Sequence, residues 1–520
     1  MNKQQRIEQE SHPSDVRVRF NELQAKLPEL WKAIGRHHPG GPIEEDNTIV
    51  VIPSLTVDVE MPITKQQAYE ERFLFLLFLL RQPDISLIYI TSTPIDPAII
   101  EYYLDVLPGV VSTNARTRLS LVSPKDGSHR PLTEKLLERP RLIRHIQSLI
   151  PDMNRAHMVP FNTTDLEREL AVRLGIPMYA ADPTYFAFGT KSGSRRIFAE
   201  EGVPYPLGAE DLYDLESLVA SIKQIRSQRP GIEKVIVKLN EGVGGMGNAI
   251  VDLSQVSGWG DADETAAIES AVRDMHFELE EVKYDDYIET LYRNGAIVEE
   301  LIAGRSLKSP SAQLRATPLG EVEMLSTHDQ MLGGPTGQTF LGSRFPADPQ
   351  YSWIIMREAL KIGKRLASEG IVGRFAVDFV VVQNESGEWK PYAIEVNLRK
   401  GGTTAPFLTL QYLTDGMYHP EEGVFRTIRG DEKCYVSSDH IESPAYRVFT
   451  SADLFEIVSR YRLHFDHTSQ TGVVLHMMSG VGGFGMFGVT CIGDTIEEAD
   501  VLYKRFNAVI DQEAEKALGT

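Results

Sequence analysis

The chain has 520 residues, which is too many for one hydrophobic core, so two to four domains are expected. Its net charge of -20 argues against a nucleic-acid or anionic-membrane partner, since either would need a basic face. The presence of only two cysteines, Cys434 and Cys491, argues against a disulfide framework, and the charged, non-apolar N-terminus predicts a cytoplasmic protein.

The N-terminal part alternates between helix and strand patterns. Residues 1–45 are polar, and apolar residues at spacings of three and four predict one helix over 18–34, so we expect an N-terminal helical arm. The pattern then predicts strands over 49–52 and 85–91 and helices over 65–81 and 98–107. This alternation indicates a parallel sheet between helices, in an α/β domain over 46–180. The apolar run 73–80 is far shorter than the roughly 20 residues of a membrane span and predicts a buried helix.

A strand that runs into a glycine-rich loop is the first candidate for a binding site. Val235, Val237 and Leu239 alternate with Ile236 and Lys238, which predicts a strand. Four glycines follow, and such a loop leaves backbone N–H groups free to bind phosphate: Gly242, Gly244, Gly245 and Gly247. A second apolar run over 248–253 predicts a hairpin, whereas a dinucleotide-binding fold would require a helix directly after the loop.

A second predicted hairpin carries acidic side chains. Alternation places Glu395, Asn397 and Arg399 on one face of a strand, and Asp378 lies in the strand before it, across a turn at 384–388. If the two strands pair, Asp378 lies opposite a residue between 393 and 395, and directly opposed side chains are about 5 Å apart at Cβ. Two carboxylates and an amide are oxygen ligands of the kind that Mg²⁺ prefers. The sequence therefore predicts a metal site at Asp378, Glu395 and Asn397.

A strand lysine, a glycine-rich loop, an Asp and an E-x-N-x-R strand in this order resemble the ATP-grasp superfamily. Strings at 309–313, 326–330, 397–404 and 471–476 resemble, more narrowly, peptide ligases of the pheganomycin-ligase type. The resemblance implies an α/β and α+β fold, with a pre-ATP-grasp domain before the nucleotide site and a small C-terminal domain. The expected domains are the arm at 1–45, the pre-ATP-grasp domain at 46–180, the ATP-grasp domain at 181–415 and a C-terminal domain at 416–520 that closes the substrate site.

The resemblance also implies ATP with one or two Mg²⁺ ions, Mn²⁺ being an alternative, and a set of site residues. Those expected to bind nucleotide are Lys191, Lys238, the four loop glycines, Glu299, Glu300 and Leu301. Those expected to bind substrate are Lys308, Ser311 and Gln313, and Arg399, Arg374 and Arg315 are expected to steady an acyl phosphate. Lys191 could instead lie at the solvent-exposed start of a helix without binding phosphate. Similarly, Lys308, Gln313 and Arg315 could simply lie at the edge of an antiparallel sheet without binding substrate. Which acidic residue binds the ribose is undecided, because the family commonly has a second acid at the position of Arg305 and Ser306.

The implied activity is that of a biosynthetic, ADP-forming carboxylate–amine ligase that makes an amide or peptide bond through an acyl phosphate. Its expected partners are a small-molecule carboxylate and an amine, such as an amino acid or peptide, with no nucleic acid and no membrane. The alternative is a carboxylate kinase, or a ligase with a thiol or other non-amino-acid acceptor, because such an enzyme would use the same ATP-binding residues. The sequence is compatible with a homo-oligomer and specifies neither the substrates nor the pathway.

Overall fold

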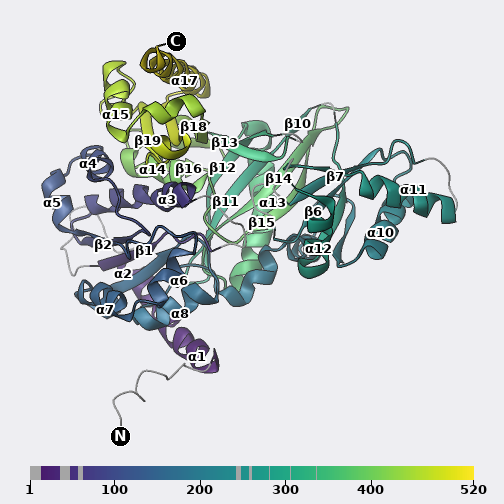
Figure 1. Cartoon of the computed structure of the whole chain (residues 1–520), viewed down its shortest axis with the longest axis horizontal. Coiled ribbons are helices and arrows are strands. Elements are labelled where there is room, and N and C mark those ends of the chain that lie inside the picture. Colours follow the sequence, from purple (N-terminus) through teal and green to yellow (C-terminus); the bar gives the residue numbers. More distant parts are fainter. Residues whose placement is uncertain are drawn as a thin grey trace, which may run out of the picture.

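The computed structural model describes residues 13–34, 47–56, 63–241, 247–256, 261–279, 282–304, 306–334 and 337–519. Figure 1 shows a large central sheet, with the N-terminal and C-terminal parts at one end and a smaller sheet at the other. Among the described residues, no helix is long and apolar enough to cross a bilayer.

The N-terminal part is built on a parallel sheet in the order β3-β2-β1-β4, as the strand pattern predicts. Its strands are β1 (Asn47–Ile52), β2 (Ile85–Ile90), β3 (Leu119–Val122) and β4 (Ala156–Pro160). The elements between and after them are α4 (Pro97–Asp105), α5 (Ser112–Thr117), α6 (Leu132–Leu137), α7 (Pro140–Ser148), η3 (Met153–Arg155), α8 (Asp165–Leu174) and η4 (Pro183–Gly189). The sheet lies between helices because both of its faces are apolar.

Two predicted helices are each divided in the structure. The helix expected over 18–34 is α1 (Pro13–Gln24) followed by α2 (Leu27–Ile34), because Pro28 has no N–H to donate back to Gln24. The helix expected over 65–81 is α3 (Ile63–Glu71) followed by the 3-10 helix η2 (Leu74–Arg81). The break lies at Arg72 and Phe73, where the Arg72 guanidinium turns to a carboxylate of the C-terminal part. The apolar run is buried, as predicted.

The smaller sheet has the strand order β5-β9-β6-β7-β8 and forms one lobe. Its strands are β5 (Gly208–Leu212), β6 (Lys234–Leu239), β7 (Asn248–Asp252), β8 (His276–Phe277) and β9 (Ala296–Glu300). Its helices are α10 (Leu215–Gln228), α11 (Asp261–Arg273) and α12 (Tyr284–Asn294), and α9 (Lys191–Glu200) leads into it. The predicted hairpin is confirmed, since β6 and β7 are antiparallel with Lys238 opposite Asn248. Gly242, Gly244 and Gly245 lie outside the described residues.

The central sheet contains the second predicted hairpin and continues into the C-terminal part in the order β10-β14-β11-β12-β13-β18-β20-β19, with β15 paired to β14. Its first strands are β10 (Leu307–Lys308), β11 (Pro310–Ala316), β12 (Val322–Gly333), β13 (Thr339–Phe345), β14 (Gly373–Gln383) and β15 (Trp389–Asn397). Its C-terminal strands are β18 (Cys434–Glu442), β19 (Gly472–His476) and β20 (Met486–Gly493). The remaining elements are α13 (Pro349–Ser368), α14 (Thr404–Thr414), β16 (Met417–His419), β17 (Val424–Arg426), η5 (Pro444–Val448), α15 (Ser451–Arg460), α16 (Gly480–Phe484) and α17 (Ile496–Leu518).

The end of α3 is tied to the C-terminal part by a buried carboxylate. Glu71 is fully buried, and its Oε2 accepts a hydrogen bond of 3.1 Å from the backbone N–H of Ser479, just before α16. Burial raises the pKa of the Glu71 carboxyl to about 7. The folded chain therefore holds a proton on Glu71 over a pH range in which the unfolded chain has lost it.

We predict that Glu71→Gln makes stability less dependent on pH. Because the pKa of Glu71 is raised in the folded protein, its contribution to stability is present below about pH 4.5 and is lost as pH rises to about 7. A tenfold change in a protonation equilibrium corresponds to about 1.4 kcal/mol. Between pH 5 and pH 8, the free energy of unfolding of the variant should therefore rise by roughly 2 kcal/mol relative to that of the wild type. Thermal unfolding at both pH values measures this. Glu101→Gln, at an exposed position of α4, is the control, and equal changes in the two variants would contradict the prediction.

Candidate functional site

The smaller lobe contributes a buried carboxylate that binds two cations. Glu299, in β9, is 1% exposed and accepts hydrogen bonds of 2.7 Å from Lys238 Nζ and 2.7 Å from Arg195 Nη1. Burial alone would raise the pKa of Glu299, but the charges of Lys238 and Arg195 outweigh it and hold the pKa below its ordinary value. Lys238 is therefore held by its own lobe, at the end of the strand that enters the glycine-rich loop.

The other predicted hinge acid is engaged differently. Glu300 lies 2.9 Å from Arg229 Nη1 and accepts a hydrogen bond of 3.0 Å from the backbone N–H of Leu207. Both acids are thus paired with protein groups, and contact of either one with a sugar stays a prediction, as does the role of Leu301.

Lys191 is the first residue of α9, and the local packing fixes its position. Thr190 caps the helix by accepting a hydrogen bond of 3.0 Å from the N–H of Gly193. Gly193 is required there because a Cβ would overlap the carbonyl oxygen of Ala187. Lys191 is only 7% exposed, so the alternative of a solvated helix start does not hold. Burial, reinforced by the charge of Lys238, lowers its pKa to about 7.

The predicted acidic hairpin is confirmed, with Asp378 of β14 directly opposite Glu395 of β15. Asp378 Oδ1 accepts a hydrogen bond of 3.0 Å from Gln330, and Oδ2 accepts one of 3.0 Å from Asn397. Glu395 contacts the Lys191 ammonium group. Burial raises the pKa of Asp378, whereas the charge of Lys191 opposes that shift.

These side chains fit a Mg²⁺ ion in their chemistry. The described residues contain no cluster of three or more His, Cys, Asp or Glu side chains that could hold a metal on their own. The set of Asp378, Glu395 and Asn397 instead offers two carboxylates and one amide oxygen. Mg²⁺ is usually bound by one or two carboxylates together with substrate phosphates, so this partial ligand set is of the expected kind.

Arg399 follows β15 and lies close to this group. Its guanidinium carbon is 6.0 Å from the centre of the Phe161 ring, which follows β4 of the N-terminal sheet. Burial lowers the pKa of Arg399; the Asp378 carboxylate opposes that shift, and the charge of Arg72 adds to it. Arg399 therefore lies between the acidic hairpin and the N-terminal part.

The other two predicted arginines do not lie beside Asp378 and Glu395. Arg315 and Arg374 are opposite each other in β11 and β14, and at about 3.3 Å per residue Arg374 is roughly 13 Å along its strand from Asp378. Arg315 donates a hydrogen bond of 2.6 Å to Glu323. Burial, with the charge of Arg315, lowers the pKa of Arg374 to about 10. This arrangement gives no support to a contact of either arginine with an acyl phosphate near Arg399.

The predicted substrate residues have three different environments. Ser311 is buried and lies opposite Asp378 in the neighbouring strand. Gln313 donates to Thr403 and accepts a hydrogen bond of 3.3 Å from Thr404, so it positions the loop after Arg399. Lys308 is exposed on the edge strand β10, as its alternative interpretation expects. Contact with substrate stays a prediction for all three.

Two residues at the site were not assigned a specific role from the sequence. Arg195 binds Glu299 and lies one helical turn after Lys191, which is the signal that could have identified it. Gln330 binds Asp378 and ends the 326–330 string that resembles the peptide ligases.

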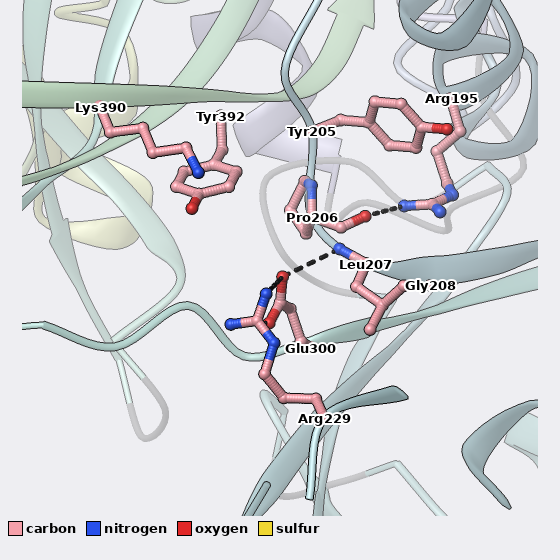
Figure 2. A pocket seen from close by; sticks show the side chains of 9 residues that line it. All are labelled: Arg195, Tyr205, Pro206, Leu207, Gly208, Arg229, Glu300, Lys390 and Tyr392. Carbon is pink, nitrogen blue, oxygen red and sulfur yellow. Dashed lines mark hydrogen bonds and ion pairs between the residues drawn. The ribbon is translucent and has the colours of Figure 1, made fainter. Parts of the chain in front are cut away.

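A polar cavity of about 310 Å³ lies where the smaller lobe meets β15. Figure 2 shows Lys390 and Tyr392 on one side of it and the chain from Tyr205 to Gly208 on the other, with the Glu300–Arg229 pair beside it. The lining residues are Arg195, Tyr205, Pro206, Leu207, Gly208, Arg229, Glu300, Lys390 and Tyr392. None of the three predicted metal ligands lines it, although Lys390 and Tyr392 belong to the same strand as Glu395 and Asn397.

We predict that Glu299→Gln destabilises the smaller lobe. Removing the shared negative charge leaves Lys238 and Arg195 buried without it, and breaking a buried ion pair costs about 3–5 kcal/mol. Chemical denaturation of the variant measures this loss. Asp211→Asn is the matched control, because the Arg196–Asp211 pair is 47% and 45% exposed and should contribute less than about 1 kcal/mol. Equal effects in the two variants would contradict a structural role for Glu299.

Comparison with known proteins finds similarity to ATP-grasp proteins. A family model described as IQCH-like, ATP-grasp matches residues 184–274 and 270–421, and one for the PGM1 C-terminal domain matches 453–506. The chain is 28% identical over 450 residues to the L-propargylglycine–L-glutamate ligase of Streptantibioticus cattleyicolor, which covers 85% of this chain and 88% of that protein. It is 24% identical over 382 residues to the IQ motif-containing protein H of Danio rerio, covering 65% of this chain and 36% of that one.

Solved structures share the fold. An ADP complex of N5-carboxyaminoimidazole ribonucleotide synthetase matches with a TM-score of 0.50 and 13% identity, over 91% of this chain and 98% of that one. Rhizobium etli pyruvate carboxylase matches with a TM-score of 0.51 and 15% identity, over 89% of this chain and 37% of that one. The predicted ATP-grasp fold is confirmed, and the comparisons support an ADP-forming ligase activity.

Proposed function

We propose that the chain activates the carboxylate of an amino acid with ATP and joins it to the amine of a second amino acid or a peptide. The observation that carries this proposal is the Asp378–Glu395 pair, flanked by Lys191 and Arg399. The substrates are suggested by the ligase from Streptantibioticus cattleyicolor, which is named for two amino acids and is similar over most of both chains. The predicted cytoplasmic location, the domain boundaries and a homo-oligomeric state stay predictions.

Two lysines and the glycine-rich loop bind the triphosphate in this proposal. Lys238 reaches the phosphates from β6 and Lys191 from the start of α9, while Glu299 keeps Lys238 in place. Asp378, Glu395 and Asn397 would hold one or two Mg²⁺ ions, Mn²⁺ being an alternative, and the bound metal would neutralise negative charge on the phosphates. Lys191 contacts Glu395, and it would be released to bind phosphate if that carboxylate held a metal ion instead.

The reaction has two steps, and Arg399 serves both. An oxygen of the substrate carboxylate attacks the γ-phosphorus and ADP leaves, which gives an acyl phosphate. The amine then attacks the acyl carbon, inorganic phosphate leaves, and the amine loses a proton as the amide forms. Arg399 binds the reacting carboxylate and the developing negative charge, because a preorganised cation stabilises charge that appears in the transition state. A carboxylate kinase would stop after the first step, so only pairing with an acceptor distinguishes it.

We predict that Glu395→Gln abolishes most Mg²⁺-dependent ADP formation while the fold is retained. Loss of one preorganised charged group at such a site costs about 10²–10³-fold in kcat. Steady-state ADP release at saturating Mg²⁺ measures this. Glu385→Gln, in the exposed turn of the same hairpin, is the control, and normal turnover of the Glu395 variant would show that the metal assignment is wrong.

For Lys238→Ala we expect weaker ATP binding, by about 10- to 100-fold, because hydrogen bonds to charged groups contribute about 1.5–3 kcal/mol. Calorimetric titration with a non-hydrolysable ATP analogue and Mg²⁺ measures this directly. Lys234→Ala removes an exposed lysine from the start of the same strand and should bind the analogue as wild type does. Unchanged affinity in the Lys238 variant would remove that residue from the phosphate site.

A further inference from the structure

An ion pair far from the metal ligands in sequence joins the N-terminal and C-terminal parts of the chain. Arg72 Nη2 lies 2.5 Å from Asp439 Oδ2, and the two side chains are 10% and 7% exposed. Arg72 directly follows α3, which lies between the N-terminal sheet and the C-terminal part in Figure 1, and Asp439 belongs to β18. Buried charges are costly to desolvate, so this pair calls for an explanation beyond surface pairing.

Asp439 lies in an irregular stretch of β18. The pairing of β18 with β20 shifts between Ser438 and Ile441, which leaves Asp439 and His440 outside the regular ladder. Such bulges redirect side chains and are over-represented next to active sites. His440 Nδ1 lies 2.8 Å from Asp439 Oδ1, so the carboxylate is held by His440 on one side and Arg72 on the other.

Arg72 also lies near Arg399, the arginine at the proposed reaction centre. The Phe161 ring, 6.0 Å from the Arg399 guanidinium, is 5.6 Å from the ring of Phe73, the residue after Arg72. The two guanidinium groups both carry a positive charge, so they repel each other. An anion bound between them would relieve that repulsion.

Arg72 has a donor that the described part of the protein does not use. Its Nε is buried, and no hydrogen-bond acceptor for it is present among the described residues. Buried polar groups are nearly always hydrogen-bonded, and an unused one indicates a partner that is still to bind. A carboxylate is the natural partner, because its two oxygens match the fork of a guanidinium group.

We propose that Arg72 and Asp439 bind the acyl-donor amino acid, whose carboxylate lies between Arg72 and Arg399 and whose α-ammonium group binds Asp439. This inference rests on the proposed function and adds to it the two residues that recognise the donor and the requirement for its free α-amino group. The existing pair is complementary to such a substrate, since an amino acid carries one charge of each sign. Asp439 binds the α-ammonium group, and Arg72 helps to orient the carboxylate toward the γ-phosphate.

The test compares acids with and without an α-amino group. ADP release is measured with the proteinogenic L-amino acids, Mg²⁺ and ATP. For the best of them, KM is then determined alongside that of the acid lacking only its α-amino group. Wild type should favour the amino acid, and Asp439→Asn should raise its KM by about 10- to 100-fold while KM for ATP stays unchanged. In that variant the preference over the desamino acid should disappear.

Arg72 variants separate recognition of the carboxylate from recognition of the amino group. Arg72→Ala should raise KM for the amino acid and the desamino acid alike, and Arg72→Lys should restore part of the loss. Asp500→Asn is the matched control, because the Arg344–Asp500 pair, at 3.0 Å, also joins a strand of the central sheet to the C-terminal part but is 43% and 27% exposed. If Asp439→Asn does not fold, Asp439→Glu keeps the charge and moves the carboxylate, and it should still lose the preference.

The outcomes distinguish this inference from the function on which it rests. Variants that lower the unfolding temperature but keep the wild-type preference would show that the pair is only structural. Equal use of the amino acid and its desamino analogue by wild type would likewise overturn the donor assignment while leaving the ligase intact. Absence of ADP release by wild type with every acid and amine tried would instead overturn the proposed function.

Discussion

Asp378 and Glu395 face each other across β14 and β15, and the other groups of the site are arranged around that pair. Two like charges this close are stable only with cations nearby, and the chain supplies them from separate elements. Lys191 comes from the first turn of α9, and Arg399 from the segment directly after β15. A metal ion and the phosphates of ATP would complete the same balance of charge, which is why the arrangement suits phosphoryl transfer to a carboxylate.

Much of this site could be predicted because its signals are local. Alternation with a period of two places Glu395, Asn397 and Arg399 on one face, and a turn between two such strands sets the register with Asp378 to within a few residues. The glycine-rich hairpin and the parallel N-terminal sheet were predictable for the same reason. Lys191 was placed by resemblance to the family, and the structure shows that it is buried beside the acidic pair.

What the sequence could not show depends on contacts between distant segments. Arg72 and Asp439 are 367 positions apart, and nothing in the local pattern of either residue predicts that they meet. Arg195 looks like one more basic residue on a helix until β9 places Glu299 against it. Arg315 and Arg374 were expected near the reacting carboxylate because of their charge, yet strand pairing places them several residues further along the sheet.

Product analysis would test the central claim, ATP-dependent formation of a bond between a carboxylate and an amine, most directly. The enzyme would be incubated with ATP, Mg²⁺ and pairs of amino acids, and nucleotides and condensed products would be identified by mass spectrometry. The account predicts ADP and phosphate with particular pairs only, together with a product lighter than the two substrates by one water. AMP and pyrophosphate, or ADP with no condensed product for any acceptor, would contradict it.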